Sequence, residues 1–245
     1  MKVIRLAFLA MFVLASLATS AKTYNVVGAH FPPWMYEENG EAKGFYVDLL
    51  ELMLEEVDGI EVNYVFYPVP RLLNVLTTDK NVFSLGIAKN EVLEPKFHWV
   101  GPIYPRIFAV YQLSERTDLD IETLSDIQGH NIGVGRGYAA IDDLLDAGVS
   151  KEHIKEVAID SQNVQKLFAK RIDFLVSNDM VLSHLLKQDG HKWPDVEQSI
   201  ILSDQYLFAY AFNKGFDQSV IEKLQTSLEK VKSSGKYDAL VDKYF

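Results

Sequence analysis

Three basic residues stand where a folded chain could present them to an anion. Arg136 lies in the run GVGRG at residues 133–137, Arg71 follows a proline at an expected helix start, and Lys89 directly follows an expected strand. Glycines let the backbone approach a ligand closely, and free N–H groups at a helix start favour anions. The pattern makes these residues candidates for contact with a small anion, but it does not determine the charge of the ligand, and Arg71 and Lys89 are equally compatible with solvated surface positions.

Aromatic residues form a second group of candidates. Phe31 and Trp34 flank a Pro-Pro loop, and Tyr138 follows Arg136 and Gly137. Loop aromatics of this kind commonly form a wall against the apolar part of a ligand. The alternative is that they pack in the hydrophobic core. We expect Phe31 and Trp34 to line a site, with Tyr46 and Tyr138 as further wall candidates.

Other kinds of site have little support. The six histidines show no paired spacing and the chain has no cysteine, so we predict no metal site. The glycines near Arg136 lack the later glycine and the acidic partner of a dinucleotide fingerprint. No G-x-S-x-G motif is present either. We therefore expect no catalytic residue and no cofactor.

The first 21 residues have the features of a secretory signal peptide. Lys2 and Arg5 precede an apolar run from Leu6 to about Ala18, and small residues follow it up to Ala21. This run is shorter than the roughly 20 apolar residues of a membrane span. Because no cysteine could carry a lipid, we expect the mature protein to be free in a bacterial periplasm.

The charge of the chain limits its partners. It has 24 Lys and Arg against 34 Asp and Glu, a net charge of −10. Removing residues 1–21 takes away two basic residues and no acid, which gives 22 against 34, or −12. This excess of acid argues against nucleic acid and anionic membrane surfaces as partners. A small anion can still bind, because it responds to local charge.

The hydrophobic pattern after residue 22 alternates between strands and helices. Strands are expected at residues 24–28, 60–67, 82–88, 131–134, 154–159 and 173–176, with helices between them. Such alternation is typical of parallel α/β sheets. A polar stretch at residues 114–120 separates two sets of these elements, which suggests two lobes. Two amphipathic helices end the chain, the first stopping near Gly235.

Five segments in fixed order carry a resemblance to a known family. They are GFYVD (44–48), FHWVGPIY (97–104), LSDIQGHNIGV (124–134), RIDF (171–174) and the ending SGKY to KYF (234–245). With them the chain resembles the extracytoplasmic solute-binding proteins, family 3, that serve polar amino-acid ABC transporters. The resemblance implies a two-lobed periplasmic-binding-protein-like (type II) α/β fold. Two strands, near residues 109–112 and 206–210, would cross between lobes formed by residues 22–110 with 207–245, and by 111–206.

The resemblance also implies where a ligand binds, and there this chain departs from the pattern. In amino-acid-binding relatives an arginine clamps the α-carboxylate, and this position falls on Leu93, after Ala88, Lys89 and Asn90. The acid that meets the α-amino group falls on Asn178, although Asp179 could replace it. A leucine cannot bind a carboxylate, and an amide binds an ammonium less well. We therefore expect a site that is not built for an ordinary α-amino acid.

The function expected from these observations is capture of a small polar solute, an amino acid or a similar compound, for an inner-membrane ABC permease. The protein would be a periplasmic monomer that closes its lobes on the ligand. One alternative is presentation of the ligand to a membrane signalling receptor. Another is a dehydratase on the same scaffold, which would need a general acid or base from Glu91 or Asp179.

Overall fold

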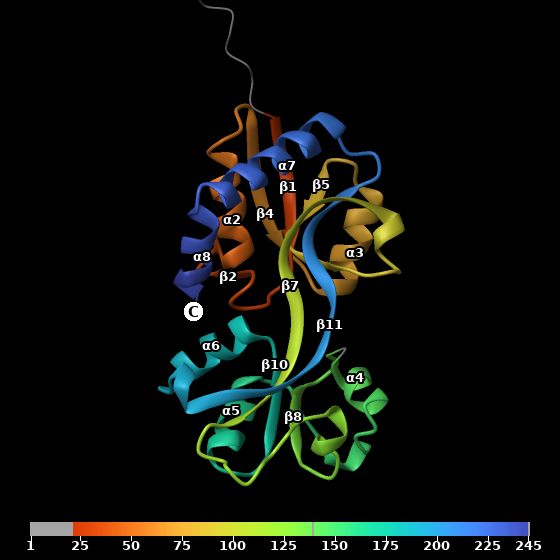
Figure 1. Ribbon diagram of the computed structural model, residues 1–245. Coiled ribbons are helices and arrows are strands. Elements are labelled where there is room, and N and C mark those ends of the chain that lie inside the picture. Colours follow the sequence, from red (N-terminus) through yellow and green to blue (C-terminus); the bar gives the residue numbers. More distant parts are fainter. Residues whose placement is uncertain (1–21, 139, 245) are drawn as a thin grey trace, which may run out of the picture.

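The computed structural model describes residues 22–138 and 140–244. The signal peptide expected over residues 1–21 lies outside this part of the chain. No helix within the described ranges is long and apolar enough to cross a membrane. The described chain forms an upper and a lower body in Figure 1, called lobe 1 and lobe 2 below.

Lobe 1 is built around β1 (Lys22–Gly28), which lies between two parallel neighbours, β4 (Ile60–Phe66) and β5 (Val82–Ser84). The helices of this lobe are α2 (Phe45–Leu54), α3 (Val69–Thr78), α7 (Gln218–Ser233) and α8 (Lys236–Tyr244). A hairpin of β2 (Tyr36–Glu38) and β3 (Glu41–Lys43) leads into α2. The two C-terminal helices thus pack on the N-terminal half of the chain, beside α2 (Figure 1).

Lobe 2 repeats the same alternation. Its parallel strands are β8 (Ile132–Gly135), β9 (Ile154–Val157) and β10 (Phe174–Ser177). Its helices are α4 (Ala140–Asp146), α5 (Ser161–Phe168) and α6 (Asp179–Gln188). Single 3-10 turns in this lobe lie at Leu124–Ile127, Lys151–His153 and Trp193–Asp195. A further 3-10 turn, Glu94–Lys96, belongs to lobe 1. The predicted α/β alternation is therefore present in both lobes.

Two long strands connect the lobes. β7 (Phe97–Leu113) and β11 (Val196–Asn213) pair with each other along most of their length. In lobe 1, β11 also pairs with β5 and with β6 (Ile87–Lys89), and in lobe 2, β7 pairs with β10 through residues 109–111. In β7, residues 106–108 lie between the part paired in lobe 1 and the part paired with β10. Residues 203–206 of β11 lie opposite them. The crossing through β7 therefore lies a few residues before the expected segment 109–112 (Figure 1).

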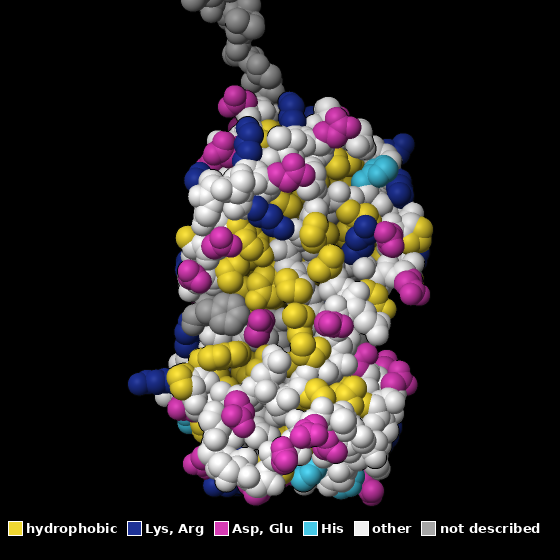
Figure 2. Space-filling model, viewed as in Figure 1, with side chains coloured by type: hydrophobic (Ala, Val, Ile, Leu, Met, Phe, Trp, Pro, Cys, Tyr) yellow, Lys and Arg dark blue, Asp and Glu magenta, His cyan; other side chains and the backbone are white. Residues whose placement is uncertain are grey.

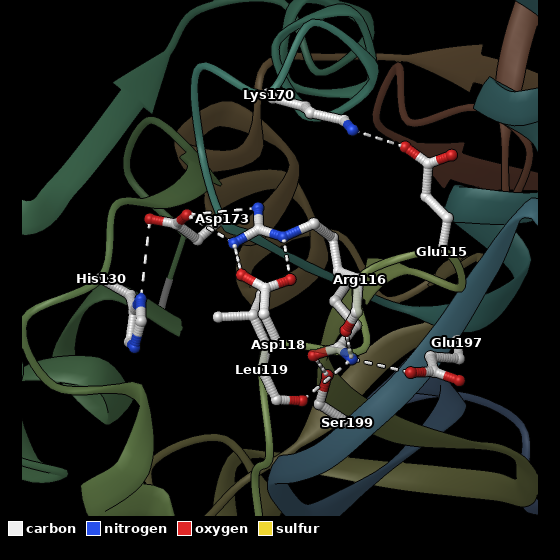
Figure 3. Close-up of polar contacts among 10 residues, drawn as sticks. Glu115, Arg116, Asp118, Leu119, His130, Lys170, Asp173, Glu197 and Ser199 are labelled. Atoms are coloured by element: carbon white, nitrogen blue, oxygen red, sulfur yellow. Dashed lines mark hydrogen bonds and ion pairs between the residues drawn. The ribbon is translucent and has the colours of Figure 1, made fainter.

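A polar network anchors the segment that follows β7. Arg116 forms ion pairs with Asp118 at 2.8 Å and with Asp173 at 3.5 Å (Figure 3). The buried Gln112 side chain donates to the carboxylate of Glu197 at 2.7 Å and accepts from Ser199. The polar stretch at residues 114–120 is thus tied to lobe 2 by the ion pair of Arg116 with Asp173, while Gln112 at the end of β7 bonds to β11.

Glycine sets the local geometry at two points of lobe 1. Gly44, just before α2, has φ of 115°, and a Cβ there would lie 2.6 Å from the carbonyl oxygen of Trp34. Gly86 interrupts the single strand expected over residues 82–88, which is two short strands, β5 and β6. A Cβ on Gly86 would lie 2.5 Å from the ring of Tyr46. A larger residue would therefore displace that ring.

The hydrophobic core fills both lobes and continues between them. One cluster of buried side chains spans lobe 1 and the α5–α6 side of lobe 2, and a second lies around β8, β10 and α4. On the face shown in Figure 2, charged side chains are scattered over both lobes, and hydrophobic ones gather over lobe 1 and at the level where the lobes meet. No basic patch dominates this face.

Candidate functional site

A cavity of about 460 Å³ lies between the two lobes. Lobe 1 contributes the loop before β2, the first half of α3, the segment from Gly86 to Leu93, and Phe208 of β11. Lobe 2 contributes Arg136, Gly137 and Tyr138, which follow β8. Loops at strand ends place these groups together, as expected for a cleft beside parallel strands. A ligand held here would contact both lobes.

The lining of the cavity is mostly apolar. Its hydrophobic side chains include Ala29, Phe31, Met35, Tyr46, Val69, Leu72, Leu73, Ile87, Ala88, Leu93, Tyr138 and Phe208. Among the described residues that line it, Arg136 is the only arginine or lysine, His30 is the only histidine, and none is acidic. Its size and composition match those of small-molecule sites, which are apolar with a few polar groups for orientation.

Two aromatic rings from opposite lobes meet across the cleft. The ring of Phe31 contacts that of Tyr138 edge to face, with centroids 6.2 Å apart. The Tyr138 hydroxyl donates a hydrogen bond to the carboxylate of Asp160, just before α5. Burial and this bond raise the pKa of Tyr138, so its hydroxyl remains a donor. The two rings also line a second, more polar pocket that includes Asp160 and His184.

Tyr46, in the first turn of α2, belongs to the lobe 1 wall. Its side chain is 1% exposed and its hydroxyl has no hydrogen-bond partner among the described residues. The end of its ring lies against Gly86, itself a residue of the cavity wall. Burial raises the pKa of Tyr46 well above its ordinary value. The wall therefore contains an unpaired, protonated hydroxyl.

Comparison with known proteins identifies the family. A model of the bacterial extracellular solute-binding proteins, family 3, matches residues 25–245. The chain belongs to this family. The family assignment agrees with the resemblance that the five sequence segments carried, and it covers both lobes and both connecting strands.

Individual relatives of this solute-binding protein are distant but nearly full-length. A probable histidine-binding protein of Campylobacter jejuni is 22% identical, over 88% of this chain and 81% of its own length. A putative ABC transporter arginine-binding protein 2 of Escherichia coli is 26% identical, over 100% and 98%. The crystal structure of an ancestral cationic amino acid solute-binding protein matches with a TM-score of 0.77 at 20% identity, over 91% and 95%. The predicted two-lobed fold is confirmed.

Six of the candidate residues from the sequence line the cavity. They are Phe31, Ala88, Asn90, Arg136, Gly137 and Tyr138. Leu93, where the resemblance implied an arginine, lines it as well. The Asn90 side-chain oxygen accepts from the backbone N–H of Leu93 at 2.9 Å, which fixes this loop. The structure thus gathers these residues at one place, with an apolar group at position 93.

Three other candidates lie away from the cavity. Trp34 is 1% exposed in the core, where its ring stacks on that of Tyr46 with centroids 5.1 Å apart. Arg71 is exposed and lies over the ring of Tyr67 at 4.4 Å. Lys89 forms an ion pair with Glu94 at 2.9 Å. None of the three is among the residues of the cavity wall.

The last two candidates, Asn178 and Asp179, lie at the junction of β10 and α6. The Asn178 side chain donates to the carbonyl of Ile107 and accepts from the N–H of Met180, both at 3.1 Å. The Asp179 carboxylate accepts from the Tyr104 hydroxyl at 3.1 Å, and burial raises its pKa. Both side chains have partners within the protein, and neither lines the cavity.

Several wall residues could not be recognised in the sequence as part of a site. These residues are apolar, and the sequence pattern around them predicts packing in the hydrophobic core. They are Met35, Leu72, Leu73 and Phe208. Tyr46 was a wall candidate, but its unpaired hydroxyl has no signal in the sequence. Within the described residues, no three His, Cys, Asp or Glu side chains are grouped to hold a metal ion.

Proposed function

We propose that this protein captures a small polar solute, an amino acid or an amino-acid-like compound, in the interlobe cavity and delivers it to an inner-membrane ABC permease. It acts as a monomer in the periplasm after removal of residues 1–21. The observation that supports this most is that the cavity wall is shared by two lobes, and that within the described residues the chain passes between these lobes along β7 and β11.

The lobes move as units about the crossing segments. Residues 22–105 with 207–245 form one unit and residues 109–202 the other, and the crossing residues lie between them. A ligand that contacts Asn90 from one lobe and Arg136 from the other has more contacts in the closed state than in the open state. This difference in affinity shifts the population toward closure. The permease then recognises the closed surface.

Delivery to a permease is supported by the names of the relatives, which include a putative ABC transporter arginine-binding protein. Binding without chemistry is supported by the cavity wall. The dehydratase alternative assigned the general acid or base to Glu91 or Asp179, and neither residue lines the cavity. Glu91 is exposed, and Asp179 is hydrogen-bonded to Tyr104 outside the wall.

A ligand screen on the mature protein, from Lys22 onward, tests this proposal. Amino acids, dicarboxylates, polyamines, short peptides and aromatic acids are added singly, and the melting temperature is measured. A ligand specific for the folded state at 100 times its Kd adds about 2.7 kcal/mol. We expect at least one class of compound to raise the melting temperature. The same compound should change the tryptophan fluorescence, to which Trp34, stacked on Tyr46, contributes. No response from any class, or turnover of prephenate detected by NMR, would contradict it.

A further inference from the structure

We propose that the cavity selects an aromatic carboxylic acid that carries a hydrogen-bonding group at the end opposite its carboxylate, and that the Tyr46 hydroxyl binds this group. The inference rests on the proposed function, in that it takes the interlobe cavity as the solute site. It narrows that function to a ligand class and assigns Tyr46 as a residue that determines specificity.

The first argument is the unpaired hydroxyl of Tyr46. A buried hydroxyl without a hydrogen-bond partner costs free energy. Native proteins rarely leave a buried hydroxyl unpaired without a reason. Nearby Tyr210 shows the usual arrangement, since its buried hydroxyl donates to the carbonyl of Tyr46 at 2.8 Å. Tyr46 has no such partner among the described residues, yet its ring lies at the cavity wall beside Gly86. A ligand atom that accepts this hydrogen bond would satisfy the hydroxyl.

The second argument is the aromatic character of the wall. Phe31, Tyr46 and Phe208 line the cavity from lobe 1, and Tyr138 lines it from lobe 2. Tyr46 and Phe208 also contact each other, with ring centroids 5.8 Å apart. Aromatic rings pack favourably against other rings in offset or edge-to-face geometry. A flat apolar ring between the two lobes would therefore gain contacts that an aliphatic or cationic side chain would not.

The third argument is the distribution of charge. Arg136, a residue of the cavity wall from lobe 2, forms no ion pair with another described residue. It can therefore pair with a ligand carboxylate. No acid lines the wall, and the two polar residues at the β10–α6 junction are engaged elsewhere. An α-ammonium group would enter the cavity without a counter-charge, which is unfavourable.

These three features define one orientation of the ligand. The carboxylate faces Arg136 of lobe 2, the ring lies among the four aromatic side chains, and the distal polar group reaches Tyr46 of lobe 1. Each lobe then holds one end of the same molecule. A compound lacking either end would favour closure less, because one lobe would lose its polar contact.

Isothermal titration with four probes tests the inference: 4-hydroxyphenylacetate, phenylacetate, L-tyrosine and L-arginine. We expect 4-hydroxyphenylacetate to bind most tightly, phenylacetate about tenfold more weakly, and the two amino acids more weakly still. Tyr46→Phe should weaken binding of 4-hydroxyphenylacetate about tenfold and leave phenylacetate unchanged. Arg136→Gln should weaken both acids. Tyr237→Phe, which removes a hydroxyl bonded to Ile103 outside the cavity, is the matched control and should change neither.

The outcomes separate this inference from the proposed function. If L-arginine or L-tyrosine binds more tightly than both acids, the ligand class is wrong, while solute binding itself is supported. If Tyr46→Phe weakens phenylacetate as much as 4-hydroxyphenylacetate, the hydroxyl does not contact the distal group and the assignment of Tyr46 is wrong. If none of the probes and none of the wider screen binds, the proposed function fails as well.

Discussion

The cavity wall of lobe 1 and the β10–α6 junction of lobe 2 both contain buried polar side chains, but they differ in how these are paired. At the junction, Asn178 bonds to Ile107 and Met180, and Asp179 accepts from Tyr104. In the cavity wall, the Tyr46 hydroxyl has no partner among the described residues. Buried polar groups with internal partners stabilise the fold, whereas an unpaired one in a wall residue is a candidate for pairing with a ligand.

This difference shows why position within a family is an incomplete guide to a site. Asn178 and Asp179 lie where the resemblance implied a ligand-binding acid, yet their side chains bond to Ile107 and Tyr104 of β7. Tyr46 lies on the buried stripe of α2, where a core residue is expected. The partners of each side chain, more than its place in the chain, distinguish ligand-binding from structural roles. Four experiments with substituted proteins test this distinction.

The largest effect is expected for Gly86→Ala. The added Cβ would lie 2.5 Å from the Tyr46 ring, which must move or strain the backbone. Such overpacking costs about 1–3 kcal/mol of the free energy of unfolding, and the shifted ring should also abolish ligand binding. Urea unfolding and titration measure the two effects. Gly215→Ala is the control, because its Cβ meets only the flexible Lys80 side chain. Equal effects of both changes would show that the Tyr46 ring is not held by Gly86.

Asn178→Ala should destabilise the protein by about 2 kcal/mol, since it removes the cap of α6 and leaves the Ile107 carbonyl without its donor. The Kd of a cavity ligand should stay within about twofold, as expected for a distant, independent site. Asn178→Asp keeps the cap but places a buried carboxylate oxygen against the Ile107 carbonyl, so it should cost at least as much. A large loss of affinity with normal stability would instead make Asn178 a ligand contact.

Tyr210→Phe and Tyr46→Phe form a matched pair, because both side chains are fully buried and only the first has a partner. Tyr210→Phe should lower the free energy of unfolding by about 1 kcal/mol. Tyr46→Phe should leave it unchanged or raise it slightly, because it removes an unsatisfied hydroxyl. Urea unfolding without ligand measures both. A destabilised Tyr46→Phe protein would reveal a structural partner for that hydroxyl.

The smallest effect is expected for Asp179→Asn, and it depends on pH. Burial raises the pKa of Asp179 in the folded state, so the unfolded carboxyl ionises at lower pH than the folded one. The stability of the native protein therefore falls as pH rises from about 4 through the raised pKa, and then levels off. Asp179→Asn should lose this dependence and be slightly more stable at pH 7. A parallel pH profile for both proteins would contradict this.

The alternation of strands and helices made the fold predictable from the sequence. Strands of four to seven residues with Val, Ile and Phe were found at the expected places, except where Gly86 interrupts residues 82–88. Gly86 interrupts them because the Tyr46 ring, from a helix 40 residues earlier, occupies the space of its side chain. This contact between distant segments leaves no trace in a local pattern.

The site was less predictable, because side-chain direction depends on the tertiary structure. Arg136 and Tyr138 were recognisable, since a glycine-rich strand end places them at the cleft. Arg71 and Lys89 looked equivalent to them by charge, but one lies over Tyr67 and the other pairs with Glu94. The Pro-Pro loop directs Phe31 to the cavity and Trp34 to the core, a choice that the spacing of the two residues does not specify.

The measurement that tests the account most directly is the distance between the lobes with and without ligand. Because the chain has no cysteine, spin labels can be placed at Lys80→Cys in lobe 1 and Lys151→Cys in lobe 2, both exposed. A second pair of spin labels, at Lys80→Cys and Lys230→Cys within lobe 1, is the control. We predict that the compound with the largest melting shift changes the interlobe distance distribution and leaves the control unchanged. A melting shift without any interlobe change would contradict binding between the lobes.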